Sequence, residues 1–190
     1  MMKKKKLVIA VTGASGSVYA RTLLDTVAGL SDQVDRVALV FSENAEKVWE
    51  YELKDQSYKQ YAFERFDKKD FFSPIASGSA GFDAMIVCPC SMGTLGRMAA
   101  GISDDLITRA ADVQLKERRP LVLVPRETPY NLLHLQHMVS LTQAGAMICP
   151  ASPSFYSHPE SFTALAATVT NRALQLCGLH PEAYRWGDDQ

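Results

Sequence analysis

The 190-residue sequence contains no apolar run long enough to cross a membrane. The apolar segment that follows the N-terminal lysines, Leu7–Val11, has only five residues and is interrupted by Thr12 and Gly13. A secretory signal needs an apolar region of roughly 7–15 residues, and a membrane-spanning helix needs about 20. We therefore expect a cytoplasmic protein without a membrane partner, whose lysines form a solvated tail before a buried strand.

Cysteine is scarce, and its spacing indicates neither a disulfide framework nor a metal site. The four cysteines include Cys88 and Cys90, which one residue separates, whereas redox and zinc motifs usually place two residues between the thiols. His134 and His137 share a predicted helix, but no carboxylate motif accompanies them. We predict reduced, mostly buried cysteines and no bound metal.

Neither sign of charge is in excess. The formal net charge is -1, so the sequence lacks the positive field on which non-specific nucleic-acid binding depends, and we expect no nucleic-acid partner. The Walker A lysine, the Gly-x-Gly-x-x-Gly fingerprint and any Ser-His-Asp pattern are also absent. A content of 47% hydrophobic and 22% charged residues is typical of globular proteins, and the length fits one domain over residues 1–190.

Apolar segments of strand length alternate with longer segments of helical pattern. Strands are predicted over 7–11, 37–41, 84–88, 120–124 and 146–149, and helices over 17–30, 44–53, 92–100, 104–116, 130–144 and 160–176. Residues 54–72 are charged and aromatic and show neither pattern, and 73–81 are predicted to be a loop. The alternation predicts an α/β fold of the Rossmann-like, doubly wound kind, with a mostly parallel sheet and helices on both faces.

Polar loops follow the first two predicted strands. Gly13, Ala14 and Ser15 precede a helix, where glycine permits a close approach of the backbone and the helix N-terminus attracts anions. The alternative for this segment is a tight turn in which Ser17 caps the helix. Ser42 follows the second strand, where dinucleotide-binding folds usually carry an acidic ribose ligand. It therefore favours a ligand without an adenosine ribose, unless it is only a helix cap.

Two further polar loops follow the third and fourth strands. Ser91, Gly93 and Thr94 begin another helix, either as a phosphate or polar-ring site or as capping residues. Arg126 and Glu127 lie between two prolines that stiffen their loop. This pair is either a simple ion pair or an anion-binding arginine beside a carboxylate that transfers protons. Parallel strands bring such loops to one edge of the sheet, so we predict a single ligand site.

Arg109 and Lys116 lie seven residues apart on one face of a predicted helix. Such pairs usually belong to a solvated face. The alternative is an anion site that completes the active site of a neighbouring subunit.

Taken together, the stretches Cys88–Leu95, Leu115–Leu121 and Val124–Pro129 resemble the flavin prenyltransferase family of the UbiX type. The resemblance extends from Gly13 to Trp186. It implies a flavoprotein fold, a dodecameric homo-oligomer and flavin mononucleotide (FMN) as cofactor. The implied reaction joins a dimethylallyl group from dimethylallyl phosphate to N5 and C6 of reduced FMN, and UbiD-type decarboxylases would receive the product.

The resemblance also assigns roles to particular residues. FMN binding is implied for Gly13, Ala14, Ser15, Ser42, Ser91, Met92, Gly93, Thr94 and Arg126. Substrate binding is implied for Arg109, Lys116, Tyr156, Arg172 and Trp186. Catalytic roles are implied for Ser15, Glu52 and Glu127, with Glu50 as an alternative to Glu52.

Two other functions remain as alternatives. FMN-dependent cysteine decarboxylases share the fold, but they use a catalytic histidine and a Pro-Ala-Ser-Ala-Asn-Thr loop, whereas residues 89–94 here read Pro-Cys-Ser-Met-Gly-Thr. A non-catalytic flavin-binding protein would not need the cations at Arg109, Lys116 and Arg172. The absence of an Asp-rich metal-diphosphate motif favours a monophosphate donor. Arg21 follows Ala20 where the family suggests a Gly-Arg pair, and residues 54–72 have no clear counterpart.

Overall fold

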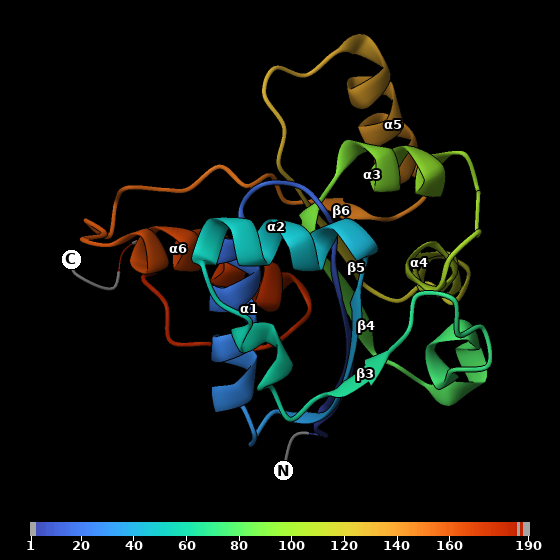
Figure 1. Ribbon diagram of the computed structural model, residues 1–190, viewed down its shortest axis with the longest axis horizontal. Helices are drawn as coiled ribbons and strands as arrows, with labels where there is room; N and C mark the ends of the chain where they lie inside the picture. The colour runs from blue at the N-terminus through green and yellow to red at the C-terminus, as the bar shows by residue number, and fades with distance from the viewer. Residues whose placement is uncertain (1–2, 186, 188–190) are drawn as a thin grey trace.

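A parallel sheet with helices on both faces forms the centre of the molecule (Figure 1). The computed structural model describes residues 3–185 and 187. Within them, the strands are β1 (Lys5–Val11), β2 (Val34–Phe41), β3 (Glu64–Phe66), β4 (Ala84–Cys90), β5 (Leu121–Pro125) and β6 (Met147–Ile148). The helices are α1 (Ser17–Gly29), α2 (Glu43–Leu53), α3 (Met92–Ala99), α4 (Leu106–Lys116), α5 (Leu132–Gln143) and α6 (Phe162–Leu176).

The strand order is β3-β2-β1-β4-β5-β6, and every pairing is parallel. This order confirms the predicted doubly wound fold. The chain proceeds outward from β1 in one direction and then returns to add β4 on the other side of β1. The crevice between the loops after β1 and β4 is therefore the topological switch point, where such sheets bind ligands.

Alternate residues of the central strands pack into separate hydrophobic cores. Leu7, Ile9 and their equivalents contact α1, α2 and α6, whereas Val8 and Ala10 lie on the face covered by α3, α4 and α5. Burial on both faces explains why these strands read as continuous apolar runs in the sequence. It also places α4 and α6 on opposite faces of the sheet.

The sequence predicted five of the strands but not β3. That strand has only three residues, Glu64 and Arg65 are exposed, and it pairs only with β2 at the edge of the sheet. Charged, exposed residues give no hydrophobic pattern, so no strand was expected there. The third predicted strand, 84–88, continues to Cys90 as β4, and the predicted loop 73–81 contains two short 3-10 turns.

Residues 54–63 pack against α1 and α2 through a polar cluster around Asp55. This carboxylate accepts hydrogen bonds from Ser57 and from Trp49 Nε1, and it pairs with Arg21. Hydrogen bonds from Ser57, Trp49 and Arg21 together lower the pKa of Asp55 despite an opposing contribution from burial. Arg21 therefore has a structural partner in the segment for which the sequence offered no match. In the described part of the chain, no helix has the length and apolarity needed to cross a bilayer.

Candidate functional site

Backbone hydrogen bonds join the loops that follow β1, β2 and β4. Ser42 donates its N–H to Val11 O at 2.9 Å, and Thr12 donates its N–H to Pro89 O at 3.2 Å. The Thr12 hydroxyl donates to Pro89 O and accepts from the Ser91 N–H, at 2.8 Å in each case. These contacts bring the loops at residues 12–16, 42–44 and 91–94 to one edge of the sheet, as the sequence predicts.

The loop at Gly13 is shaped for an anion. A Cβ atom at Gly13 would lie 2.6 Å from Asn44 Cβ, so the start of α2 can approach this loop only because the residue is glycine. The N–H groups of Gly13, Ala14 and Ser15 have no hydrogen-bond acceptor among residues 3–185 and 187. Consecutive donors of this kind form an anion-binding concavity.

Glu52 caps α1, the role that Ser17 has in the alternative interpretation of this segment as a tight turn. Its carboxylate accepts from the Ser17 N–H at 2.7 Å and from the Gly16 N–H at 3.0 and 3.1 Å. The N-cap position itself is Gly16, with a φ of 117°, which has no side chain that could cap the helix. The interpretation of Ser17 as the capping residue is therefore wrong. Burial opposes ionisation of Glu52, but hydrogen bonds from Ser15, Ser17 and Gly16 outweigh it and lower its pKa. Glu50, the alternative to Glu52, instead accepts from the Tyr58 hydroxyl.

Arg126 connects the loop after β5 with the loop after β1. Its N–H donates to Cys90 O at 3.3 Å, and its Nε donates to Ser15 O at 2.9 Å. Glu127 follows it and lines a small cavity of about 230 Å³ together with Arg126, Tyr130 and Ser152. Glu127 Oε1 accepts from the Thr128 N–H at 3.0 Å, whereas the Arg126 side chain contacts Ser15 O; in the described part of the chain these two side chains do not form the simple ion pair that was the alternative.

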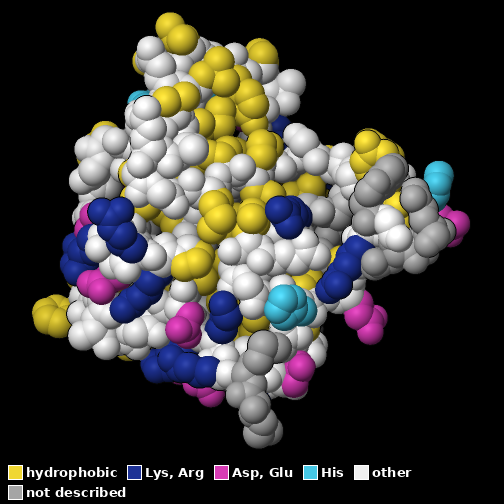
Figure 2. Space-filling view, turned by 180° about the vertical axis from the view of Figure 1, so that it is seen from behind, with side chains coloured by type: hydrophobic (Ala, Val, Ile, Leu, Met, Phe, Trp, Pro, Cys, Tyr) yellow, Lys and Arg dark blue, Asp and Glu magenta, His cyan; other side chains and the backbone are white. Residues whose placement is uncertain are grey.

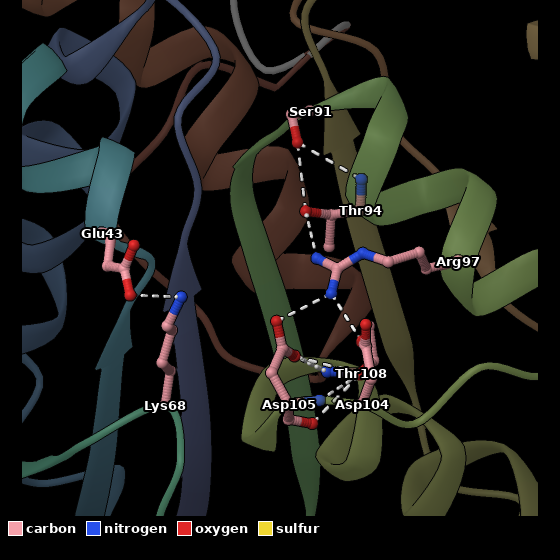
Figure 3. A network of polar contacts seen from close by, with 8 residues as sticks. All are labelled: Glu43, Lys68, Ser91, Thr94, Arg97, Asp104, Asp105 and Thr108. Carbon is pink, nitrogen blue, oxygen red and sulfur yellow. Dashed lines mark hydrogen bonds and ion pairs between the residues drawn. The ribbon is translucent and has the colours of Figure 1, made fainter.

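The helix start at Ser91 contains a chain of hydroxyl contacts. Ser91 Oγ accepts from the Thr94 N–H at 3.3 Å as the N-cap of α3, and the Ser91 hydroxyl donates to Thr94 Oγ1 at 3.0 Å (Figure 3). Capping thus accounts for part of this motif. Met92 packs its side chain into the core, and a Cβ atom at Gly93 would meet no atom within 4 Å. Burial raises the pKa of the Cys88 and Cys90 thiols, which keeps them protonated at neutral pH.

Arg172 lines a groove of about 720 Å³ between α6, the segment after β6 and residues 182–184. Its guanidinium donates to Gln175 Oε1 at 3.4 Å. Tyr156 belongs to the same segment after β6 and is 66% exposed. Trp186, which the resemblance assigns to substrate binding, lies outside the described residues.

Arg109 and Lys116 do not join Arg172. Both belong to α4, on the opposite face of the sheet from α6. Arg109 donates to Ala76 O and pairs with Asp112 at 2.8 Å, and Lys116 pairs with Glu117 at 3.0 Å. A single chain therefore brings together the FMN-binding candidates, but it does not bring Arg109 and Lys116 of α4 to Arg172 of α6.

Comparison with known proteins identifies the family of this chain. Residues 1–174 match the Flavoprotein family. The chain is 41% identical to the flavin prenyltransferase UbiX of Methanocaldococcus jannaschii over 96% of this chain and 98% of that protein. It belongs to the flavin prenyltransferases of the UbiX type.

Solved structures of this family show the same fold. A dodecameric FMN-dependent UbiX-like decarboxylase from Escherichia coli O157:H7 superposes with a TM-score of 0.89 at 40% identity, covering 95% of this chain and 98% of that one. AnUbiX (PadA1), in complex with FMN and dimethylallyl pyrophosphate, superposes with a TM-score of 0.88 at 38% identity, covering 97% of this chain and all of that one, 100%.

Sequence reasoning did not single out three residues that contact these loops. Thr12 bridges the loops after β1 and β4, Tyr19 donates to Ala151 O at 3.4 Å beside Gly16, and Arg97 contacts Thr94. Thr12 could have been found from the sequence, because it lies between a buried strand and a glycine-rich turn. Tyr19 and Arg97 lie inside helices, where the sequence alone does not distinguish site residues from packing or solvated ones.

Proposed function

We propose that this chain transfers a dimethylallyl group from dimethylallyl phosphate to reduced FMN, as a metal-independent flavin prenyltransferase. The observation that carries the proposal is the convergence of the loops after β1, β2, β4 and β5 on one sheet edge. The identity to named flavin prenyltransferases over nearly the whole chain supports it. No observation favours a cysteine decarboxylase or a flavin-storage protein over this function.

FMN would be held by the converging loops. The unpaired N–H groups of Gly13, Ala14 and Ser15 suit its phosphate, with Ser42 at the adjacent helix start. Ser91, Met92, Gly93, Thr94 and Arg126 would contact the remainder of the molecule. Because the Met92 side chain is in the core, its contribution would come from the backbone N–H in the first turn of α3.

The protein groups near this site would stabilise the departing phosphate and handle protons. When bound, reduced FMN supplies N5 and C6 as the positions that are alkylated. Arg172 and Tyr156 would bind the phosphate of the donor, where charge develops as it leaves. Ser15 and Glu52 would orient groups at the reacting centre, and either Glu127 or the released phosphate would take the C6 proton.

The complete site would be shared between subunits of a homo-oligomer, as a dodecamer. Arg109 and Lys116 lie on the face opposite Arg172, so a neighbouring subunit is needed to bring these groups together.

Helix α5 supports such an assembly, because Leu132, Leu133 and Val139 are 68%, 60% and 57% exposed. Figure 2 shows hydrophobic side chains gathered at the end of the molecule where α5 lies. Exposed apolar patches of this kind are typical of protein interfaces. Trp186 would complete the substrate site.

Residues 1–190 would act as one FMN-binding domain, and the prenylated flavin would pass to a UbiD-type decarboxylase. The free thiols of Cys88, Cys90, Cys149 and Cys177 support a reducing, cytoplasmic location.

Anaerobic incubation with reduced FMN tests the proposal. Dimethylallyl monophosphate and diphosphate are supplied in separate reactions, and the flavin is analysed by mass spectrometry. A gain of one dimethylallyl group on the flavin is expected with the monophosphate. FMN retained without any gain in mass from either donor would contradict the proposed transferase activity and favour a flavin-binding protein.

A further inference from the structure

Arg97 of α3 connects the flavin loop to the start of α4. One terminal nitrogen of its guanidinium contacts Asp104 Oδ1 at 2.7 Å and Asp105 Oδ2 at 2.9 Å. The other donates to Thr94 Oγ1 at 3.3 Å (Figure 3). The same arginine is thus held by two carboxylates before α4 and directed at a hydroxyl of the FMN-binding loop.

The two carboxylates restrict the position of the guanidinium. Asp105 is the N-cap of α4, and it accepts from the Thr108 N–H at 2.9 Å, within a capping box that Thr108 completes. Its side chain is only 13% exposed. Because Asp105 is fixed by its own helix, the fork of Arg97 has little freedom to turn away from Thr94.

The Thr94 hydroxyl then has only one way to contact a ligand. A hydroxyl oxygen has two acceptor lone pairs and one hydrogen. Ser91 Oγ donates to this oxygen at 3.0 Å and Arg97 donates to it at 3.3 Å, so both lone pairs are used. Residues 3–185 and 187 offer no acceptor for the remaining hydrogen. Thr94 is nearly fully buried, and buried hydroxyl hydrogens are usually paired, so an acceptor atom of a ligand bound at this loop would satisfy it.

We propose that Arg97 is a positioning residue that fixes the Thr94 hydroxyl as a hydrogen-bond donor to an acceptor atom of FMN. This inference rests on the proposed FMN site. Without Arg97, one lone pair of Thr94 is released, and the hydroxyl can turn to accept a hydrogen bond instead of donating one. Arg97 thereby determines that the Thr94 hydroxyl binds a hydrogen-bond acceptor of the ligand and not a hydrogen-bond donor.

The test is a double-mutant cycle on FMN affinity, measured by quenching of flavin fluorescence. Arg97→Met removes the donor while keeping much of the apolar stem, and Thr94→Val removes the hydroxyl. Arg36→Met is the matched control, because Arg36 pairs with Glu64 at the sheet edge and its side chain has the same 32% exposure as that of Arg97. The melting temperature of each variant is measured in parallel.

We expect Arg97→Met to weaken FMN binding by about fivefold to tenfold in the wild-type background, and by less than about twofold in the Thr94→Val background. Arg36→Met should lower the melting temperature without changing FMN affinity. An equal loss of affinity in both backgrounds, or a lower melting temperature with unchanged affinity, would overturn the positioning role. If the wild type itself does not bind FMN, the proposed function fails and this inference fails with it.

Discussion

At the scale of single residues, Arg172 is the clearest test of the substrate site. It lines the groove beside α6, and none of the residues proposed to hold FMN lines that groove. Arg172→Ala should therefore slow prenyl transfer by about 30-fold to 1000-fold but leave FMN affinity unchanged. Loss of a charged partner for the leaving phosphate is expected to cost about 2–4 kcal/mol in transition-state stabilisation. Single-turnover transfer measures the first effect, and FMN titration measures the second. Normal turnover of the variant would show that Arg172 is only a surface residue.

Glu52 links the pH dependence of stability to the start of α1. Its pKa is lowered in the folded protein, since its hydrogen bonds to the loop at Ser15–Ser17 outweigh the effect of burial. A lowered carboxyl pKa stabilises the fold above the unfolded value of about 4.3 and loses that contribution as the pH falls through the folded value. The wild type should therefore melt at a higher temperature than Glu52→Gln at pH 7. Melting curves from pH 7 down to pH 3 should show this difference shrinking, and a constant difference would contradict the linkage.

At the scale of elements, the contact between Gly13 and Asn44 sets how closely the loop after β1 approaches α2. Gly13→Ala would place a Cβ atom 2.6 Å from Asn44 Cβ, so the loop must shift. We expect a loss of about 1–3 kcal/mol in the free energy of unfolding, together with weaker FMN binding. Asn44→Gly in the same chain should restore much of both, because it removes the opposing atom. Gly93→Ala is the control for stability, since its Cβ would meet no atom within 4 Å.

The elements also show where sequence reasoning succeeds. Strands such as β1 and β4 are buried on both faces, so their apolar runs and the polar loops after them were readable from the sequence. The role of Glu52 at α1 depends on a contact between residues 35 and 36 positions apart, and no local pattern encodes such a contact. The family resemblance, and not periodicity, singled out that residue. β3 was missed because it has only three residues, of which two are charged and exposed, so that Phe66 alone leaves no hydrophobic pattern.

At the scale of the whole molecule, the separation of α4 from α6 predicts shared active sites. An assembly whose chains all carry both Arg109→Ala and Lys116→Ala should be nearly inactive, and so should an assembly whose chains all carry Arg172→Ala. After dissociation and mixing, oligomers containing both should regain part of the prenyl transfer, because some sites would receive intact residues from each subunit. Absence of recovery in assemblies shown to have mixed would count against sharing, and an active monomer would exclude it.

The short edge strands have a consequence for how the molecule behaves at high concentration. An exposed edge can recruit strands from other chains and extend into fibrils. Here one edge is the three-residue β3, whose Glu64 and Arg65 pair with Arg36 and Glu46, and the other is the two-residue β6. Neither offers a long, uncharged template for a foreign strand. The exposed apolar side chains of α5 can therefore serve association between subunits through helices, because the strand edges do not promote amyloid-like growth.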